Sequence, residues 1–169
     1  MNLTVRTTFI KNCVFRIDEN TRMLKIALSS ITEEELWKKP NNHLNSIGNL
    51  VLHLCGNITQ YVIAPLGNLE DQRDRTLEFS TTGGYSKQEL IEKLDRVLLK
   101  AKATIARVSE ATLLKEKEVQ GFQFSGVGLI IHVVEHYSYH TGQIAFWVKL
   151  LKNKDLGFYE SFDLNKKNE

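Results

Sequence analysis

The chain has 169 residues, of which 42% are hydrophobic and 25% charged, and its formal net charge at pH 7 is +2. These values are typical of a globular protein, and we expect residues 1–169 to form a single domain. Such a small charge, without a zinc-finger, RNA-binding or recognition-helix pattern, argues against a nucleic-acid partner.

The sequence also suggests where the protein works. Its first residues lack the basic and then apolar pattern of a signal peptide, and no uninterrupted apolar run is long enough to cross a bilayer. Two cysteines, Cys13 and Cys55, are too few for a disulfide framework. We therefore expect a cytoplasmic protein with no membrane partner, in which Cys55 is a small buried apolar residue.

Helical periodicity begins near the start of the chain. Residues 4–30 are predicted to form a long helix because their apolar residues recur at helical spacing, as at Ile10, Val14, Ile17, Leu24 and Leu28. Thr32 and Glu35 then match the capping box of a short helical turn, which Pro40 is expected to end.

A second long helix is predicted from residue 46 to about residue 63. Asn45 or Ser46 is its expected cap, and Pro65 and Gly67 are expected to end it. A polar, charged link follows.

The third and fourth long helices occupy the second half of the chain. Ser86 and Glu89 form a capping box that opens a predicted helix over about 86–110. Residues 118–125 are expected to form a short extended piece, and a last helix is predicted over 126–152. Four long helices with modest links indicate an all-α four-helix bundle, whose core is a usual place for metal sites.

Three of the five histidines, His132, His136 and His140, lie four residues apart in the segment IIHVVEHYSYHTGQI. Helical residues four apart are offset by about 40° and about 6 Å, so both imidazoles can reach one ion. Residues eight apart lie about 12 Å apart along the axis, which is too far. One pair that contains His136 can therefore bind a metal, and helix geometry leaves its other member open.

A catalytic divalent ion usually has a third protein ligand and one open position. His53 is the best candidate, because on the second predicted helix it shares a polar stripe with Asn49, Asn57 and Gln60. Polar groups that face a bundle interior need partners, which a metal or a bound polar ligand would supply. His43, in a polar loop, is expected to face solvent.

Two other interpretations compete with a three-histidine site. HVVEH at 132–136 matches the H-x-x-E-H pattern of one class of zinc proteases, in which Glu135 would activate water. The third ligand would then lie beyond the helix, at Asp155, Glu160 or Asp163. That hypothesis leaves His53 and His140 unexplained. In the other interpretation, each histidine is an ordinary hydrogen-bonded residue.

The combination of several segments resembles the DinB/YfiT-like metalloenzyme superfamily. The segments are NSIGNLVLHLCGN (45–57), RDRTLEF (73–79), HVVEHYSYHTGQI (132–144) and DLGFY (155–159). The similarity covers nearly the whole chain and is closest to small bacterial proteins of unassigned function. It implies a four-helix bundle of DinB/YfiT type that binds a divalent metal, often nickel or zinc, through three histidines.

On this chain the resemblance assigns the metal to His53, His136 and His140, with His132 as a supporting residue. It also implies a homodimer, and relatives include thiol-dependent transferases and isomerases. We therefore expect a metal-dependent enzyme acting on a small-molecule substrate, either a transferase of the thiol S-transferase type or a hydrolase. Nickel or zinc is the expected metal, and a low-molecular-weight thiol such as bacillithiol is a candidate cofactor. The alternative is a non-catalytic stress-response protein that binds a metal or a small ligand.

Two residues of the fourth predicted helix are candidates for moving protons. His132 and Tyr139 are the expected catalytic residues of the site. Packing at a helix interface is the competing interpretation for Tyr139 and for its neighbour Tyr137.

Three polar residues are expected to orient the ligand histidines or a water molecule, namely Asn49, Asn57 and Gln143. In the segment 73–79, ion pairs that fix the link to the bundle are expected from Arg73, Asp74, Arg75 and Glu78. The alternative for this segment is an arginine that holds a substrate carboxylate near the metal.

Overall fold

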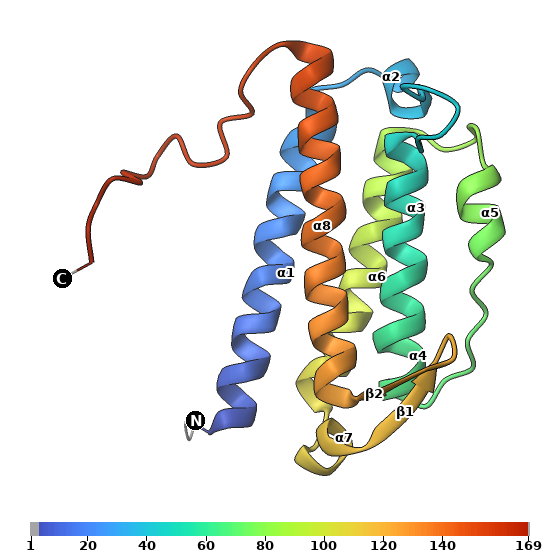
Figure 1. Cartoon of the computed structure of the whole chain (residues 1–169), viewed down its shortest axis with the longest axis vertical. Coiled ribbons are helices and arrows are strands. Elements are labelled where there is room, and N and C mark those ends of the chain that lie inside the picture. The colour runs from blue at the N-terminus through green and yellow to red at the C-terminus, as the bar shows by residue number, and fades with distance from the viewer. Residues whose placement is uncertain (1–3, 169) are drawn as a thin grey trace.

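The computed structural model describes residues 4–168, and four long helices dominate it (Figure 1). They are α1 (Val5–Ser29), α3 (Ile47–Ile58), α6 (Lys87–Arg107) and α8 (Gly126–Lys152). The helix α1 lies along α8, while α3 packs against both α6 and α8. The predicted four-helix bundle is therefore confirmed.

Each long helix begins where a hydroxyl side chain accepts a hydrogen bond from a backbone N–H of the first turn. The four capping residues are Thr4, Ser46, Ser86 and Ser125. These side chains satisfy donors that the helix itself leaves unpaired. The helices predicted over 4–30, 86–110 and 126–152 are confirmed with small differences at their ends.

The second helix is longer than predicted. A π-helical turn, η1 (Thr59–Ile63), follows α3 and leads into α4 (Ala64–Gly67), so the helical segment runs through Pro65. Proline has no backbone N–H and leaves a carbonyl one turn earlier without a donor. The wider π turn directly before Pro65 takes up this irregularity, and the helix ends only at Asn68, which has a φ of 53°.

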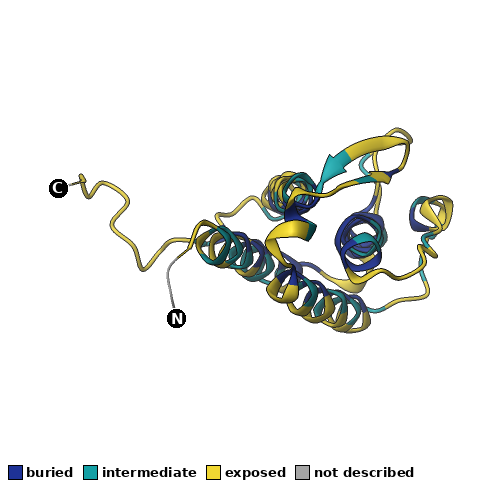
Figure 2. Cartoon of the chain, turned by 90° about the horizontal axis from the view of Figure 1, so that it is seen from below, coloured by how far each residue is buried: buried dark blue, intermediate teal, exposed yellow. Residues whose placement is uncertain are grey.

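The segment Ile47–Gly67 is the one described helix that is long and apolar enough to cross a membrane, judged by length and composition only. Its most apolar 18-residue window has a mean hydropathy of 1.2, and 67% of that window is buried inside the bundle. Such burial is what the core helix of a bundle shows. In Figure 2 the buried residues lie on the inner faces of the helices and the exposed residues outside.

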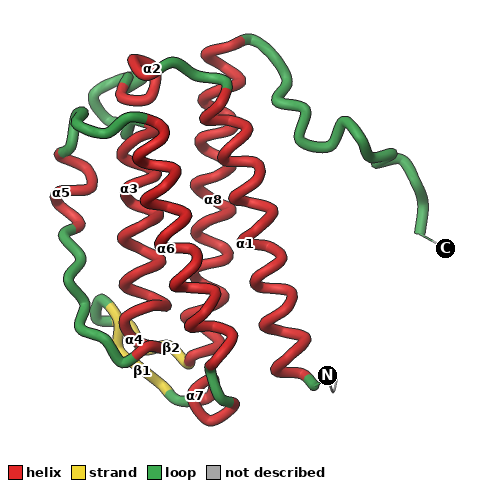
Figure 3. The backbone as a smooth tube through the Cα atoms, turned by 180° about the vertical axis from the view of Figure 1, so that it is seen from behind, coloured by secondary structure: helices red, strands yellow, loops and turns green. Residues whose placement is uncertain are grey.

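Several short elements connect the long helices. The turn predicted from Thr32 is α2 (Glu33–Trp37), whereas α5 (Arg75–Ser80) and α7 (Glu110–Leu114) were not predicted. The expected extended piece is an antiparallel hairpin of β1 (Glu116–Val119) and β2 (Phe122–Ser125). Figure 3 shows α5 and its flanking loops running along the outside of α3, and this placement brings α5 to the functional site.

Candidate metal centre

Three histidines meet between α3 and α8. The ligand-type nitrogen atoms of His53, His136 and His140 lie within 4.8 Å of one another, and Nε2 of His53 is 2.9 Å from Nε2 of His136. His53 and His140 are buried, and His136 is half-buried. The structure thus brings together the three histidines that the resemblance selected.

The donor set fits a divalent ion. Metal–nitrogen bonds of about 2.0–2.1 Å place two ligand nitrogens of a tetrahedral site about 3.4 Å apart. The distance of 2.9 Å between the His53 and His136 nitrogens is somewhat shorter, and that between the two most distant ligand atoms is at most 4.8 Å. Small side-chain rotations are enough to reach a common ion, which three imidazoles would hold with a position left open.

His53 is in contact with a buried ion pair. Its Nδ1 lies 2.9 Å from Oε2 of Glu78, and Arg73 holds the same carboxylate with two hydrogen bonds of 2.7 and 2.8 Å. The side chains of Arg73 and Glu78 are only 2% and 9% exposed. Burial alone raises the pKa of the Glu78 carboxyl, but the hydrogen bonds from Arg73 and His53 outweigh it and keep this pKa below its usual value.

Two residues of α3, Asn49 and Gly56, lie against α5 beside this ion pair. The Asn49 amide donates to the backbone oxygens of Glu78 and Thr81, at 2.9 and 2.6 Å. At Gly56 a Cβ atom would lie 1.8 Å from Oε1 of Glu78, so only glycine leaves room for the carboxylate. The side-chain amide of Asn49 is therefore bound to α5 and its C-cap rather than to a ligand histidine. It holds the backbone of Glu78, which in turn contacts His53.

Of the other two residues predicted to orient the ligands, Gln143 contacts a ligand histidine and Asn57 contacts His132. Gln143 accepts a hydrogen bond from Nδ1 of His140 through its Oε1, at 2.8 Å, which leaves Nε2 free to face the cluster. Asn57 instead lies 3.2 Å from Nε2 of His132 through its amide nitrogen. Its Oδ1 is buried and has no hydrogen-bond partner among residues 4–168.

The two predicted proton carriers lie beside the cluster. The ring of His132 stacks between those of Tyr61 and His136, with centroid distances of 3.9 and 5.3 Å. Tyr139 is 61% exposed, and its ring meets that of His140 edge-on at 5.0 Å. Their catalytic roles stay predictions. Tyr137, in contrast, is fully buried, with its hydroxyl 3.0 Å from Oγ1 of Thr21 on α1.

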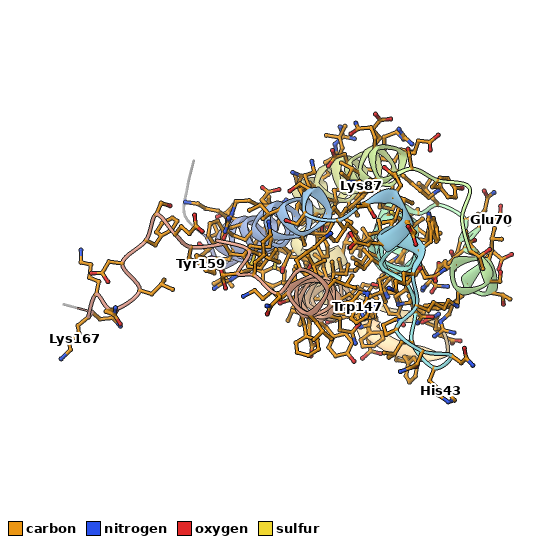
Figure 4. The ribbon with its side chains drawn as sticks, turned by 90° about the horizontal axis from the view of Figure 1, so that it is seen from above. His43, Glu70, Lys87, Trp147, Tyr159 and Lys167 are labelled. Atoms are coloured by element: carbon orange, nitrogen blue, oxygen red, sulfur yellow. The ribbon has the colours of Figure 1, made fainter. Side chains whose placement is uncertain are left out.

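Two other sequence-based hypotheses can be compared with the structure. Glu135 is exposed on α8 and His132 lies outside the cluster, so the described residues do not form the zinc-protease arrangement. Asp155, a third ligand in that hypothesis, pairs with Lys149 at 2.7 Å. His43 is exposed and lies at the outer edge of the molecule, away from the bundle (Figure 4).

The ion pairs expected in the segment 73–79 are formed only in part. The ion pair between Arg73 and Glu78 is formed, whereas Asp74 caps α5 and Arg75 lies over the ring of Phe79 at 4.9 Å. Arg73 also donates to the Gln60 side chain at 2.8 Å, so its guanidinium is already occupied. The sequence did not reveal that Glu78 is a partner of His53.

A cavity of about 690 Å³ lies on another side of α3, between α6 and the link that leads to α5. Arg73 and Glu78 form part of its wall, together with Cys55. Burial raises the pKa of the Cys55 thiol to about 12, so it is not a reactive thiolate at neutral pH. Cys55 is thus the buried apolar residue that the sequence predicted.

The histidines around the site are held in the neutral state that metal binding requires. Burial lowers the pKa values of His132 and His140. Burial and the neighbouring histidines lower that of His136 to about 3. Neutral imidazoles keep a lone pair for an ion at pH 7, so no proton has to leave these side chains first.

We expect the metal-free protein to lose stability as the pH falls below about 6.5. The unfolded chain has histidine pKa values near 6.5, whereas the folded value of His136 is about 3. Protons therefore bind the unfolded chain more tightly, and the stability present above pH 6.5 decreases as the pH falls through this window. Urea unfolding at pH 8, 6.5 and 5 measures the effect.

The neutral substitution His136→Gln is expected to flatten this pH dependence, because it removes the histidine whose pKa is lowered to about 3. His43→Gln should leave the dependence unchanged, since His43 is exposed. A stability that stays constant or rises on acidification contradicts the prediction.

Comparisons with known proteins agree with this fold. A model of the family described as "Protein of unknown function (DUF1572)" matches residues 4–163. Among solved structures, a conserved protein from Enterococcus faecalis has 15% identity and a TM-score of 0.73, and the match covers 90% of this chain and all of that one.

Two further structures are described as DinB-like proteins. The first, YjoA of Bacillus subtilis, has 18% identity and a TM-score of 0.67, and the match covers 88% of this chain and 96% of that one. The second, from Bacillus cereus ATCC 10987, has 14% identity and a TM-score of 0.66, with 85% and 91% covered. No curated protein matches the chain. At these identities the likeness shows a shared DinB-like fold.

Proposed function

We propose that this chain, which belongs to the DUF1572 family of proteins of unknown function, is a metal-dependent enzyme acting on a small molecule. The observation that carries the proposal is the convergence of His53, His136 and His140 on one point between α3 and α8. Glu78 and Gln143 occupy Nδ1 of two of these histidines, so that their Nε2 atoms are available for an ion.

Three imidazoles suit nickel or zinc, which are the proposed ions. A divalent ion in such a site supplies a Lewis acid that lowers the pKa of a water or thiol beside it. The chain supplies the three imidazoles, and His132, whose pKa burial lowers, is the proposed proton acceptor. Tyr139 is the second candidate for moving protons, at the exposed side of His140.

Either of two reactions follows from this chemistry. In hydrolysis, water attacks an electrophilic centre and a leaving group departs with a proton. In thiol transfer, a low-molecular-weight thiol such as bacillithiol loses its proton and forms a sulfur–carbon bond with the substrate as the leaving group departs. Both need a small electrophilic substrate at the open position.

The test is an assay of protein loaded with Zn²⁺ or Ni²⁺ against a panel of thiols with electrophiles and a panel of hydrolase substrates. Turnover that disappears in both His53→Ala and His136→Ala supports the enzyme. Tight metal binding without turnover on either panel rejects it and supports the alternative, a protein that binds a metal or a small ligand without catalysis.

We also propose a homodimer, which the exposed apolar residues of α8 support. Ile131, Tyr139, Phe146 and Leu150 are 48–71% exposed and lie within about 100° of one another around the helix. An apolar stripe of this kind often marks an interface. A cytoplasmic location stays a prediction.

Phe146→Asp is expected to convert the dimer to a monomer, because it places a charge in the centre of this stripe. Size-exclusion chromatography with light scattering measures the change. Leu114→Asp is the control, since Leu114 is 75% exposed on α7, away from the stripe. A wild-type protein that is already monomeric, or a variant that remains dimeric, contradicts the proposal.

A further inference from the structure

We infer that Glu78, held by Arg73, is a positioning residue of the metal centre, and that it fixes His53 in the tautomer whose Nε2 lone pair faces the other two histidines. The inference rests on the proposed metal site and assigns a role within it to a carboxylate that is 25 residues away from His53 in the sequence.

The hydrogen-bonding capacities of the groups lead to this tautomer. The ion pair with Arg73 keeps Glu78 ionised, and an ionised carboxylate only accepts hydrogen bonds. Oε2 of Glu78 lies 2.9 Å from Nδ1 of His53, so Nδ1 carries the proton in this contact. A neutral imidazole has one N–H, and Nε2 is left with its lone pair. That atom lies 2.9 Å from Nε2 of His136.

Arg73 favours the opposite tautomer by itself. Its Nη2 lies 3.0 Å from Nδ1 of His53, where a donor would prefer a bare nitrogen. However, one of the two N–H groups of Nη2 already donates to Oε2 of Glu78 at 2.8 Å, so only the other could reach Nδ1. A bare Nδ1 would also set its lone pair against that anionic oxygen. Because hydrogen bonds to ionised acceptors are the stronger ones, Glu78 decides the tautomer and Arg73 fixes Glu78.

Several contacts fix the position of the Glu78 carboxylate. Arg73 takes both oxygens, Asn49 holds the Glu78 backbone, and Gln60 binds the remaining guanidinium nitrogen. The missing side chain of Gly56 leaves the space that Oε1 occupies. An acceptor fixed in this way keeps the His53 ring in place before an ion arrives, which is what a carboxylate behind a ligand histidine contributes to metal sites.

The removal of Glu78 therefore has a specific consequence. In Glu78→Ala, Arg73 is the remaining partner of Nδ1, and Nδ1 becomes an acceptor. The proton then moves to Nε2, the atom that faces the cluster. Metal affinity is expected to fall by about 10–100-fold, the usual effect of losing such a partner.

Two measurements test the inference. Nitrogen-15 NMR of the histidine side chains in the metal-free protein reports which ring nitrogen of His53 carries the proton. Competition with a chromophoric chelator gives the affinity for Zn²⁺ or Co²⁺. We expect Nδ1–H in the wild type, Nε2–H in Glu78→Ala, and weaker metal binding in the variant. Glu70→Gln is the matched control, because Glu70 is an exposed carboxylate on the same link.

Glu78→Ala leaves Arg73 buried without its anion and is expected to be less stable. Glu78→Gln keeps an oxygen that can accept from Arg73 or His53, so it serves as the variant that folds. Its affinity is expected to lie between those of the wild type and Glu78→Ala. Wild-type affinity in a folded Glu78→Gln overturns the inference, as does an Nε2–H tautomer of His53 in the wild type.

Failure of the positioning role of Glu78 can be distinguished from failure of the proposed metal site. If the wild type binds no Zn²⁺, Ni²⁺ or Co²⁺, the proposed metal site fails. The tautomer of His53 in the metal-free protein is still measured in that case, and an Nδ1–H form that switches in Glu78→Ala supports the positioning role by itself.

Discussion

Replacing His53, His136 or His140 by alanine is expected to weaken the binding of Zn²⁺ or Ni²⁺ by roughly 100-fold or more. A structural zinc site with four ligands binds with about 10–16 kcal/mol, so one ligand contributes about 3 kcal/mol, and 1.4 kcal/mol is a factor of ten. The three side chains surround one point and none of them can take the place of another. Elemental analysis and chelator competition measure the loss.

His132→Ala is the informative comparison, because helix spacing alone gives His132 and His140 equal claims to pair with His136. His132 lies outside the group of converging nitrogens and points its Nε2 at Asn57. Its replacement is therefore expected to change metal affinity by no more than about threefold, because His132 contacts His136 only by ring stacking and does not hydrogen-bond a ligand nitrogen, unlike the partners whose loss costs about 10–100-fold. Full affinity in His53→Ala together with its loss in His132→Ala would refute this site. His43→Ala should have no effect.

The long helices could be predicted because their signals are local. Capping residues such as Ser46 and Ser86 lie next to the apolar repeats that they precede, and both act as caps. The short helix α5 (Arg75–Ser80) has no such repeat. Tertiary contacts hold it, above all the hydrogen bonds from Asn49 to its backbone. Pro65 misled the prediction because the π turn before it lets the helix continue.

Only part of the site could be predicted. The spacing of the row on α8 limits the metal pair to one that includes His136, and the polar stripe on α3 indicates His53. Neither pattern points to Glu78, since its partner lies on another element. One signal was present, because Gly56 lies inside the helix, three residues after His53. A glycine inside a helix often marks the close approach of another group, here the Glu78 carboxylate.

The shared fold does not supply the reaction. Similar bundles host different chemistry, so function has to be argued from the residues of the site. Here those residues are three imidazoles and, behind His53, a carboxylate in a buried ion pair. The way in which α5 packs against α3 therefore matters for the proposed metal centre as well as for stability.

Gly56→Ala is expected to destabilise the protein by about 2 kcal/mol. The new Cβ would lie 1.8 Å from Oε1 of Glu78 and 2.9 Å from Nε of Arg73, so this buried pair has to move. Removing one partner of a buried ion pair costs about 3–5 kcal/mol; the pair is only displaced here, so the lower end of that range applies. Alanine gains about 1 kcal/mol over glycine in a helix. The melting temperature should fall by roughly 4–8 °C for a chain of this size. Thermal unfolding measures the change.

Gly142→Ala makes the same substitution inside α8, where the added Cβ has no atom within 4 Å apart from its chain neighbours and the backbone of its own helix. Helix propensity then acts alone, and stability should rise by about 1 kcal/mol. Both variants are compared in the Phe146→Asp background, so that a dimer contact at the exposed face of α8 does not affect the measured stabilities. Stability changes of opposite sign in the two variants show that Gly56 is needed to make room for the Glu78 carboxylate. If Gly56→Ala and Gly142→Ala instead raise the stability equally, α5 can move away from the new methyl group at no cost in stability. The metal affinity of Gly56→Ala should then equal that of the wild type.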